Sequence, residues 1–346
     1  MRVSLRQFLH RVALENTLSK DFMIDGLAMD SRLVKRGDLF FAIAGCHHDA
    51  TTFIDQAIHR GAAAIMIDAE ESRSDVHGEV AMIYVKDFKK HLGKMIAQFY
   101  ALQEGAEKTY LEKMQFIGVT GTNGKTSCTQ LLTQALNLLG IETSMVGTIG
   151  YGKPGHLTPL QLTTPDTFTL QNIFHEFSLQ KVSSVVMEAS SHALDQHRTS
   201  SIPFSLGIFT NLSHDHLDYH HNMENYAKAK RRLFELDSMR MAVFNVDDSV
   251  GLQWMHEFSS TLTACGYSQT AQQASVFPSL VFAKHIQLNT DGLNVLIQSP
   301  WGEGWLRSRL VGQFNVMNLL AVIAALGLMN FTLKEILNVV PELTPP

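Results

Sequence analysis

The sequence predicts an α/β protein with two domains: an N-terminal α/β domain, and a central domain with a mostly parallel sheet and a phosphate-binding loop. Strand-length apolar runs alternate with segments of helical apolar spacing along the chain. In the second half these runs are apolar throughout, which is typical of strands buried on both faces of a parallel sheet. A glycine-rich turn ending in Gly-Lys-Thr separates one such strand from a long helix.

Residues 1–105 are predicted to form the first domain. Its strands are expected at residues 38–43, 62–67 and 81–85, with a helix at residues 52–60. After the last strand, apolar side chains recur at helical spacing over residues 88–102, so a helix is expected there. The polar residues 103–113 are expected to form a linker.

Residues 106–340 are predicted to form the central domain. Buried strands are expected at residues 183–187, 206–210 and 241–245, an antiparallel pair near 281–287 and 293–297, and helices near 315–329 and 333–339. The proline-rich residues 341–346 follow the last helix as an interdomain linker would. We therefore expect a further C-terminal domain to be missing from this chain.

The composition limits the classes of partner. The net charge of −5 and a pI near 6.3 predict no nucleic-acid and no membrane-surface binding. The three cysteines show neither metal-type nor disulfide-type spacing, and the N-terminus has no signal-peptide pattern, so we expect a cytoplasmic protein. The longest apolar stretch, residues 317–329, is too short to span a bilayer. The oligomeric state is not predicted.

The glycine-rich turn, residues 118–127, predicts a phosphate-binding loop. Its glycines allow backbone N–H groups to approach anionic oxygens, and the following helix adds partial positive charge. Lys125 is placed to reach terminal phosphates, and Thr126 to offer a hydroxyl to Mg²⁺. The spacing is a variant of the standard pattern, and the alternative is a plain glycine turn between a strand and a helix. Gly140 is expected to end that helix.

Two further segments follow predicted strand ends, the edge where open α/β sheets bind ligands. Glu188 follows one strand and would suit Mg²⁺, which needs few protein oxygens beside water and phosphate. The alternative is an N-cap region in which Glu188 faces solvent. Asp215, His216 and Asp218 follow another strand. A zinc site is the alternative there, but the spacing does not match and no cysteine is near.

A basic helix is predicted over residues 226–234. Lys228 and Lys230 cannot share a face, because two residues span roughly 200° of helical rotation. A lysine that points inward must lose its charge or be paired. A neutral, desolvated lysine can react with CO₂ to give a carbamate, an anion suited to Mg²⁺. The alternative is an ordinary solvated charge run.

Taken together and in this order, these segments resemble the Mur ligases, and among them the UDP-N-acetylmuramoyl-tripeptide synthetases. The resemblance runs through the whole chain. In the central domain it is carried by residues 118–127, 187–198, 209–234, 244–248 and 310–319. In the first domain, residues 30–32, 37–40 and 61–63 resemble the family's UDP-binding module. The combination is specific, although each segment alone is not.

The resemblance implies an ATP-dependent amide ligase. ATP would phosphorylate the D-glutamate carboxylate of UDP-MurNAc-L-Ala-D-Glu, and the amine of a diamino acid would attack the acyl phosphate. Meso-diaminopimelate is the expected diamino acid and L-lysine the alternative. Phosphoryl transfer needs charge neutralisation and alignment more than covalent help, which agrees with a loop lysine and Mg²⁺.

The resemblance also implies roles for individual residues. Thr126, Glu188, His216 and Lys230 would hold the metals, with Lys230 carbamylated because it occupies the family's lysine position. Lys125, Lys230, His216 and Glu188 would be catalytic. ATP would contact Gly121, Thr122, Asn123, Gly124, Lys125, Thr126 and Ser127, and its adenine would lie near Asn315 and Asn318. The UDP-MurNAc-dipeptide would contact Ser31, Cys46, His47, His48, Thr163, Thr164, Ser190, Gln196 and Arg198.

The sequence departs from the family pattern at several ligand positions: His214, Gln313, Met317, Leu162 and residues 46–48. Because the expected C-terminal domain would select the amino acid and close over ATP, this chain alone is expected to have little or no ligase activity. Two other hypotheses remain. One is another ligase of the superfamily, such as folylpolyglutamate synthetase, although about a hundred residues precede the loop here. The other is a non-catalytic module that binds the UDP-sugar-peptide and nucleotide.

Overall fold

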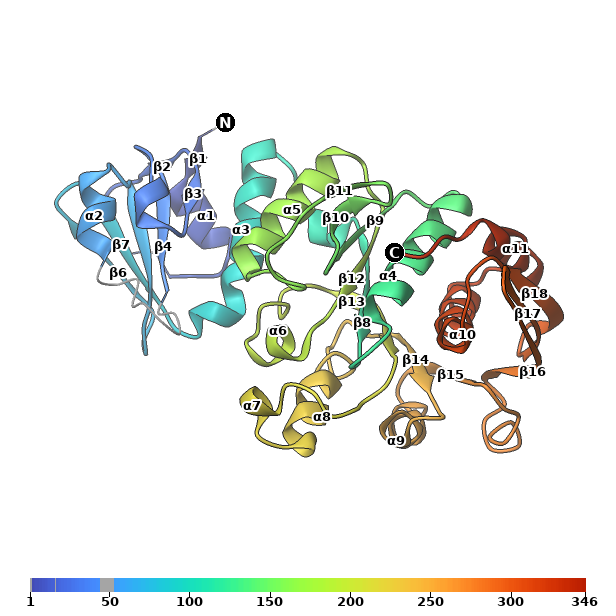
Figure 1. Ribbon diagram of the computed structural model, residues 1–346. Helices are drawn as coiled ribbons and strands as arrows, with labels where there is room; N and C mark the ends of the chain where they lie inside the picture. Colours follow the sequence, from blue (N-terminus) through green and yellow to red (C-terminus); the bar gives the residue numbers. More distant parts are fainter. Residues whose placement is uncertain (1, 16, 44–52) are drawn as a thin grey trace. The chain divides into compact units, whose positions relative to one another are not determined.

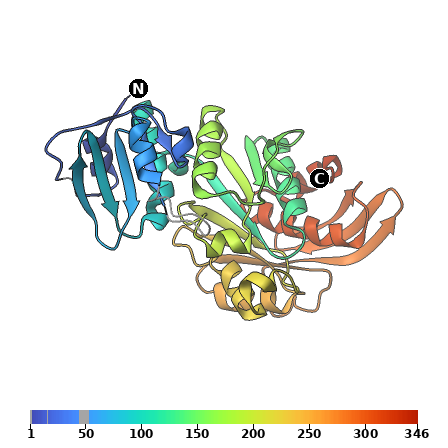
Figure 2. The same ribbon diagram turned by 60° about the vertical axis from the view of Figure 1, so that its left-hand side comes forward.

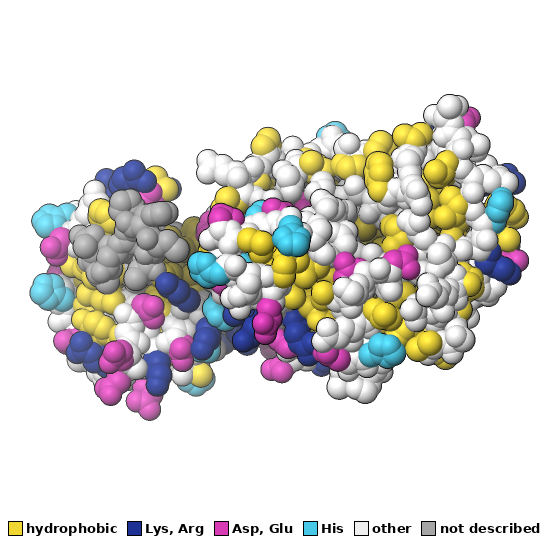
Figure 3. All heavy atoms as spheres, turned by 60° about the horizontal axis from the view of Figure 1, so that its bottom comes forward, with side chains coloured by type: hydrophobic (Ala, Val, Ile, Leu, Met, Phe, Trp, Pro, Cys, Tyr) yellow, Lys and Arg dark blue, Asp and Glu magenta, His cyan; other side chains and the backbone are white. Residues whose placement is uncertain are grey.

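The computed structural model describes residues 2–15, 17–43 and 53–346, which form two compact units, each with its own sheet (Figures 1 and 2). The first unit contains the described residues up to 113 together with residues 166–176, and the second contains residues 114–165 and 177–346. The predicted α/β class with parallel-rich sheets is confirmed. On the face seen in Figure 3, acidic and basic side chains are interspersed.

The sheet of the first unit has the order β3-β4-β5-β7-β6. Its strands are β3 (Leu27–Ala28), β4 (Leu39–Ala42), β5 (Ala64–Asp68), β6 (Arg73–His77) and β7 (Val80–Val85). Only the β6–β7 pairing is antiparallel. The sequence predicted β4, β5 and β7, which are buried on both faces. It missed β6, whose side chains alternate between exposed and half-buried at the sheet edge.

Helices cover both faces of this sheet. The helices are α1 (Leu5–Arg11), α2 (Ile54–His59) and α3 (Phe88–Glu104), and a small ladder joins β1 (Val3–Ser4) to β2 (Met23–Ile24). Because side chains alternate along a strand, Leu39 and Phe41 of β4 face α1 and α3, while Phe40 and Ala42 face α2. Residues 103–113, expected to be a linker, are instead folded, since Tyr110 is buried.

The second unit is built on an eleven-stranded sheet, counted over the described residues, with the order β11-β10-β9-β12-β8-β13-β14-β15-β16-β17-β18. Its strands are β8 (Gln115–Thr120), β9 (Thr143–Gly147), β10 (Gly150–Lys153), β11 (His156–Thr158), β12 (Ser184–Glu188), β13 (Phe204–Phe209), β14 (Met241–Asn245), β15 (Thr263–Ser268), β16 (Leu280–Asn289), β17 (Gly292–Ser299) and β18 (Gly302–Ser308). Strands β9, β12, β8, β13, β14, β15 and β16 pair in parallel in this order, and antiparallel hairpins extend both ends of the sheet. The predicted strands match β12, β13, β14, β16 and β17.

The helices of the second unit are α4 (Lys125–Leu138), α6 (Ser191–Asp195), α7 (Leu217–His220), α8 (Met223–Arg231), α9 (Ser249–Phe258), α10 (Gln313–Leu328) and α11 (Leu333–Val339). Of these, α4, α9, α10 and α11 contact strands of the sheet, and α6 and α7 contact α8. Helix α5 (Thr167–Leu179) has residues in both units. Helix α10 is buried almost all round and packs against α4 and the sheet, as its uniformly apolar sequence predicted. In the part of the chain that the structure describes, no helix has the length and apolarity needed to cross a membrane.

The proline-rich end of the chain also packs on this unit. Leu343 is buried in the core that contains α4 and α10. Gln134 of α4 exchanges hydrogen bonds with the backbone of Thr344, and Gln130 donates to the carbonyl of Pro345. Residues 343–345 are therefore held against this unit, with Thr344 and Pro345 hydrogen-bonded to α4.

The strand order places three loops at one edge of the sheet. The chain leaves β8 for β9, later inserts β12 between them, and then adds β13 on the other side of β8. Strands β12, β8 and β13 are parallel neighbours, so their carboxyl ends lie side by side. Open α/β sheets bind ligands at such a switch point. The residues that follow Thr120, Glu188 and Phe209 meet there.

Candidate active site

The glycine-rich loop joins β8 to α4 and contains two residues in the left-handed region. Gly121 has φ +147° and Gly124 has φ +84°. A Cβ on Gly121 would lie 1.9 Å from Thr210 Oγ1, and a Cβ on Gly124 would lie 2.9 Å from Asn318 Oδ1. The loop therefore needs glycine at both positions, for its backbone angles and for the close approach of neighbouring side chains.

Residues that follow β13 fix the shape of this loop. Thr210 Oγ1 donates to the Asn123 carbonyl at 2.6 Å, and the Asn123 N–H donates to Asn211 Oδ1 at 3.0 Å. The Thr122 N–H donates to the Asn211 carbonyl at 2.8 Å. The loop is therefore held by the neighbouring strand end as well as by its own helix.

Lys125 begins α4 and turns back over the loop. Its Nζ donates to the carbonyls of Gly121 and Thr122, at 3.0 and 2.9 Å. Burial lowers the pKa of Lys125, while the carboxylates of Glu188 and Asp215 oppose this shift. The ammonium group is thus placed in the curve of the loop, where a phosphate-binding lysine is expected.

Glu188 ends β12 and is completely buried. Its carboxylate accepts hydrogen bonds from Thr126 Oγ1 at 3.0 Å and from the Thr148 N–H at 2.8 Å. Burial raises the pKa of Glu188, and these hydrogen bonds oppose the rise. A Cβ on Gly147 would lie 2.3 Å from Glu188 Oε1, so the adjacent β9 leaves room for this carboxylate only because it ends in glycine. The alternative of a solvent-facing Glu188 is wrong.

Lys230 points into the site, whereas Lys228 is exposed. Lys230 is only 1% exposed, and its Nζ donates to the Gly121 carbonyl at 2.8 Å. The same Nζ lies 4.3 Å from the centre of the Tyr226 ring. Burial holds the pKa of Lys230 well below its ordinary value, and repulsion from Lys125 adds to this. The amine is therefore the more readily neutral of the two lysines at the loop.

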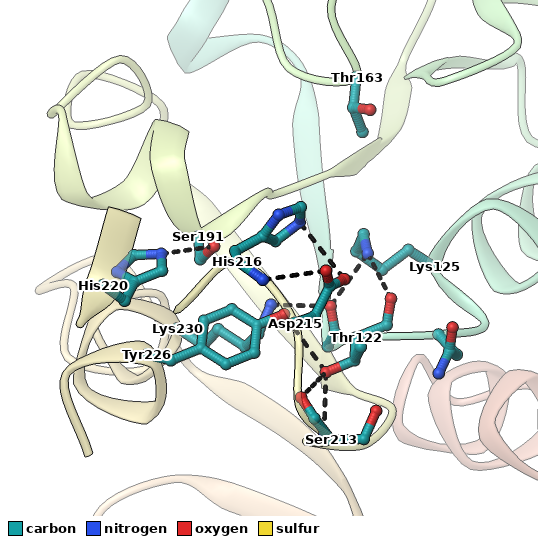
Figure 4. A network of polar contacts seen from close by, with 12 residues as sticks. Thr122, Lys125, Thr163, Ser191, Ser213, Asp215, His216, His220, Tyr226 and Lys230 are labelled. Atoms are coloured by element: carbon teal, nitrogen blue, oxygen red, sulfur yellow. Dashed lines mark hydrogen bonds and ion pairs between the residues drawn. The ribbon is translucent and has the colours of Figure 1, made fainter. Parts of the chain in front are cut away.

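His216 and Asp215 complete this cluster (Figure 4). His216 Nε2 lies 3.5 Å from Asp215 Oδ2, and Figure 4 shows the Asp215 carboxylate between the His216 ring and Lys125. The His216 ring also meets those of His192 and Tyr226 edge-on, at centroid distances of 4.9 and 6.1 Å. Nowhere in the described chain do three or more His, Cys, Asp or Glu side chains group as a metal site would.

The residues expected to contact the UDP-sugar-peptide fall into several groups. Hydrogen bonds connect four of them: Thr164 Oγ1 accepts from the Ser190 N–H, and Arg198 donates to the Thr164 carbonyl and to Gln196 Oε1. Thr163 Oγ1 lies 3.0 Å from the hydroxyl of Thr148, which also contacts Glu188. Ser31 belongs to the first unit, where its hydroxyl donates to Gln56 Oε1 at 2.6 Å. Cys46, His47 and His48 lie outside the described residues.

Asn315 and Asn318 lie in the first turns of α10, beside the start of α4. Asn318 donates to Asn315 Oδ1 at 3.1 Å, and Asn315 donates to the Val311 carbonyl at 2.8 Å. Cys128 Sγ lies 3.5 Å from Asn318 Oδ1. Asn318 also lies close to Gly124 of the loop, and a role near adenine stays a prediction. Ser127 lies in the first turn of α4.

Sequence reasoning gave no role to Thr148, Asn211, Tyr226 or Asp248. Asp248 Oδ2 accepts from the Leu212 N–H at 2.8 Å while the same carboxylate caps α9. Asn211, Tyr226 and Asp248 lie in the segments that resemble the family, which was an available signal. Thr148 had none, because only the β9–β12 pairing brings it to Glu188.

Comparison with known proteins shows the family of this chain. Residues 119–326 match the family model of the Mur ligase middle domain, and residues 23–100 match that of the Mur ligase family, catalytic domain. A UDP-N-acetylmuramoyl-L-alanyl-D-glutamate–2,6-diaminopimelate ligase of Coxiella burnetii is 39% identical over 316 residues, covering 91% of this chain and 63% of that protein. The protein of the same name from Ectopseudomonas mendocina is 41% identical over 325 residues, covering 94% of this chain and 64% of that protein.

A solved structure of a ligase with this name aligns with a TM-score of 0.83 and 30% identity, covering 100% of this chain and 68% of the other. The chain spans slightly less than two thirds of the length of the curated relatives above. One family model alone covers more than half of the chain. On these grounds, and with the loop, the buried carboxylate and the buried lysine in place, the chain belongs to the Mur ligase family.

Proposed function

We propose that this chain binds ATP and UDP-MurNAc-L-Ala-D-Glu for an ADP-forming amide ligase that adds a diamino acid to the D-glutamate carboxylate. The observation that carries the proposal is the meeting of Lys125 and Lys230 at the Gly121 carbonyl, beside a buried Glu188. Meso-diaminopimelate is the first candidate for the diamino acid, because the relatives are named for it, and L-lysine is the second.

The loop and Lys125 would hold the ATP phosphates. Backbone N–H groups at the start of α4 and the Lys125 ammonium supply positive partial and full charges where terminal phosphates would lie. Thr126 and Glu188 fit Mg²⁺, since they offer a hydroxyl and a carboxylate oxygen 3.0 Å apart, and this ion prefers oxygen ligands. Bound Mg²⁺ would offset the charge that develops during phosphoryl transfer.

Lys230 would act as a carbamate. In its neutral form the buried amine can attack CO₂, forming an N–C bond and releasing one proton to water. The resulting anion would lie near His216 and the loop, where with His216 it could serve a second metal ion. The structural support is that burial disfavours the charged amine at a position already within reach of the loop.

The substrate side would be formed by Thr163, Thr164, Ser190, Gln196 and Arg198, with Ser31 and residues 46–48 contributing to uridine binding. Arg198 supports this assignment, because a guanidinium with fixed donors suits carboxylate and phosphate groups. Attack by the diamino acid's amine on the acyl phosphate would then expel phosphate and form the amide bond.

The test separates binding from turnover. Calorimetry on this chain is expected to show Mg²⁺-dependent binding of ATP and separate binding of UDP-MurNAc-L-Ala-D-Glu, with ATP binding lost in Lys125→Ala. Turnover is measured on the whole gene product with meso-diaminopimelate, L-lysine and a folate substrate offered in turn. Product formation only with folate would assign the chain to the folylpolyglutamate synthetases. Binding without any turnover would favour the non-catalytic module.

A further inference from the structure

Tyr226 is a fully buried tyrosine that contacts two parts of the candidate site at once (Figure 4). It lies on α8, one helical turn before Lys230. Its hydroxyl oxygen lies 3.3 Å from Thr122 Oγ1 in the glycine-rich loop. Lys230 Nζ lies over its ring, 4.3 Å from the ring centre.

The contact of Tyr226 with the loop joins two hydroxyl groups, and either oxygen can be the donor. Thr122 Oγ1 accepts from the Ser213 N–H at 2.9 Å and lies 3.3 Å from the Ser213 carbonyl, to which it donates. A threonine hydroxyl has one hydrogen and two acceptor lone pairs. When the hydrogen is directed to Ser213, the remaining lone pair of Thr122 accepts the Tyr226 O–H.

Thr122 is the residue through which this contact reaches the phosphate-binding elements. Its carbonyl accepts Lys125 Nζ at 2.9 Å, and its N–H donates to the Asn211 carbonyl at 2.8 Å. A shift of Thr122 would therefore disturb its hydrogen bond to Asn211, just after β13. It would also move one of the two carbonyl groups that orient Lys125.

The ring of Tyr226 restricts the side chain of Lys230. Residues four apart on a helix lie over one another, so the ring forms one wall beside the Lys230 side chain. Its other neighbours are the rings of His220 and His216, at centroid distances of 5.1 and 6.1 Å. The ring therefore limits Lys230 to a direction in which Nζ reaches the Gly121 carbonyl.

We propose that Tyr226 is a positioning residue that fixes the glycine-rich loop and the Lys230 side chain relative to each other. Its hydroxyl positions Thr122 and, through it, Lys125, while its ring positions Lys230. The proposal rests on the proposed function, since it concerns how the same ATP site is held. It assigns Tyr226 a role without contact to phosphate or metal.

Two substitutions separate the two roles. Tyr226→Phe removes only the hydroxyl, and is expected to weaken Mg²⁺-ATP binding roughly fivefold, the effect of one ordinary hydrogen bond. It should leave Lys230 carboxylation, followed by NMR with isotopically labelled bicarbonate, unchanged. Tyr226→Leu removes the ring as well and should reduce carboxylation. Tyr110→Phe is the matched control, because this buried hydroxyl donates to Gln171 at 2.8 Å in the first unit.

A double-mutant cycle tests the contact itself. Thr122→Val removes the partner hydroxyl, so the Tyr226→Phe substitution should have no further effect on ATP affinity in that background. Additive effects, or wild-type ATP affinity in Tyr226→Phe, would overturn the proposal. If Tyr226→Phe does not fold, the ATP affinities of Thr122→Ser and Thr122→Val are compared instead. Serine should retain ATP affinity, and equal losses would again overturn the proposal.

The outcome for the proposed function is read separately. If the wild-type chain binds Mg²⁺-ATP no better than Lys125→Ala, the proposed function fails before Tyr226 is tested. If the wild type binds and only the Tyr226 results differ from expectation, the positioning role alone fails.

Discussion

Gly124→Ala should damage the proposed nucleotide site more than the same substitution at Gly140, although both glycines have nearly equal φ angles. Gly124 has φ +84° at the start of α4, and Gly140 has φ +86° just past its end. An alanine in the left-handed region costs about 1–2 kcal/mol, of which about 0.4–1 kcal/mol is offset by the stiffer unfolded chain. Both variants should therefore lose about 1 kcal/mol of unfolding free energy from backbone strain.

The difference between the two variants comes from crowding. The new Cβ at Gly140 would meet nothing within 4 Å, whereas at Gly124 it would lie 2.9 Å from Asn318 Oδ1. Asn318 must then move and weaken its hydrogen bond to Asn315, which adds about 1 kcal/mol. The shifted loop should bind Mg²⁺-ATP at least about tenfold more weakly, equivalent to about 1.4 kcal/mol.

Urea unfolding and calorimetric ATP titration of the two variants measure these effects. The expected result is a total loss of about 2 kcal/mol for Gly124→Ala and about 1 kcal/mol for Gly140→Ala, with ATP affinity changed only in the former. Equal stabilities together with equal ATP affinities would show that the contact between Gly124 and Asn318 does not constrain the loop.

Three further predictions concern charged groups. Glu188→Gln should lower the Mg²⁺-dependent part of ATP affinity by roughly 10–100-fold. Metal-free ATP binding should change little, because the amide still accepts hydrogen bonds. Calorimetric titration of ATP with and without Mg²⁺ measures both affinities, and an unaltered dependence on Mg²⁺ would count against a metal-binding carboxylate. Lys230→Met should keep the unfolding free energy within about 1 kcal/mol, since an apolar chain replaces a buried amine, while turnover by the whole gene product is lost and bicarbonate does not restore it. The Arg32 side chain lowers the pKa of Asp30 to about 2, so this exposed pair contributes a small stabilisation that is present above pH 3.8 and is lost as pH falls toward 2. Asp30→Asn should abolish that loss, and parallel urea-unfolding profiles of wild type and variant across this range would refute it.

Local chemistry made the glycine-rich loop predictable. A strand, two glycines, Lys125 and a helix lie within a short stretch of sequence, so spacing alone predicted the turn and the beginning of α4. The expected end at Gly140 is also confirmed, because its N–H and that of Ile141 close the last turn of the helix. The inward direction of Lys230 followed from two arguments together. Helical rotation showed that Lys228 and Lys230 cannot share a face, but it did not say which of them points inward. The resemblance to the family then selected Lys230.

Contacts that depend on strand order were not predictable in this way. Thr148 reaches Glu188 only because β12 is inserted beside β9, although about forty residues separate them in sequence. The edge strand β6 was missed because its polar alternation lacks the apolar run by which its neighbours were found. Residues 103–113 are polar in composition, but burial of Tyr110 and a capping box at Thr109 and Glu112 fold them.

The two lysines at the Gly121 carbonyl differ in their electrostatic surroundings, and this difference supports the separate roles proposed for them. The Gly121 carbonyl oxygen accepts hydrogen bonds from both amines. Two ammonium groups that share one acceptor in a buried site repel each other. Burial lowers the pKa of both, but Lys125 has Glu188 and Asp215 to oppose the shift, whereas Lys230 has only Asp215 and is further lowered by Lys125. The surroundings therefore disfavour the charged form less at Lys125, which suits a phosphate-binding cation, than at Lys230, whose neutral amine is the form that can react with CO₂.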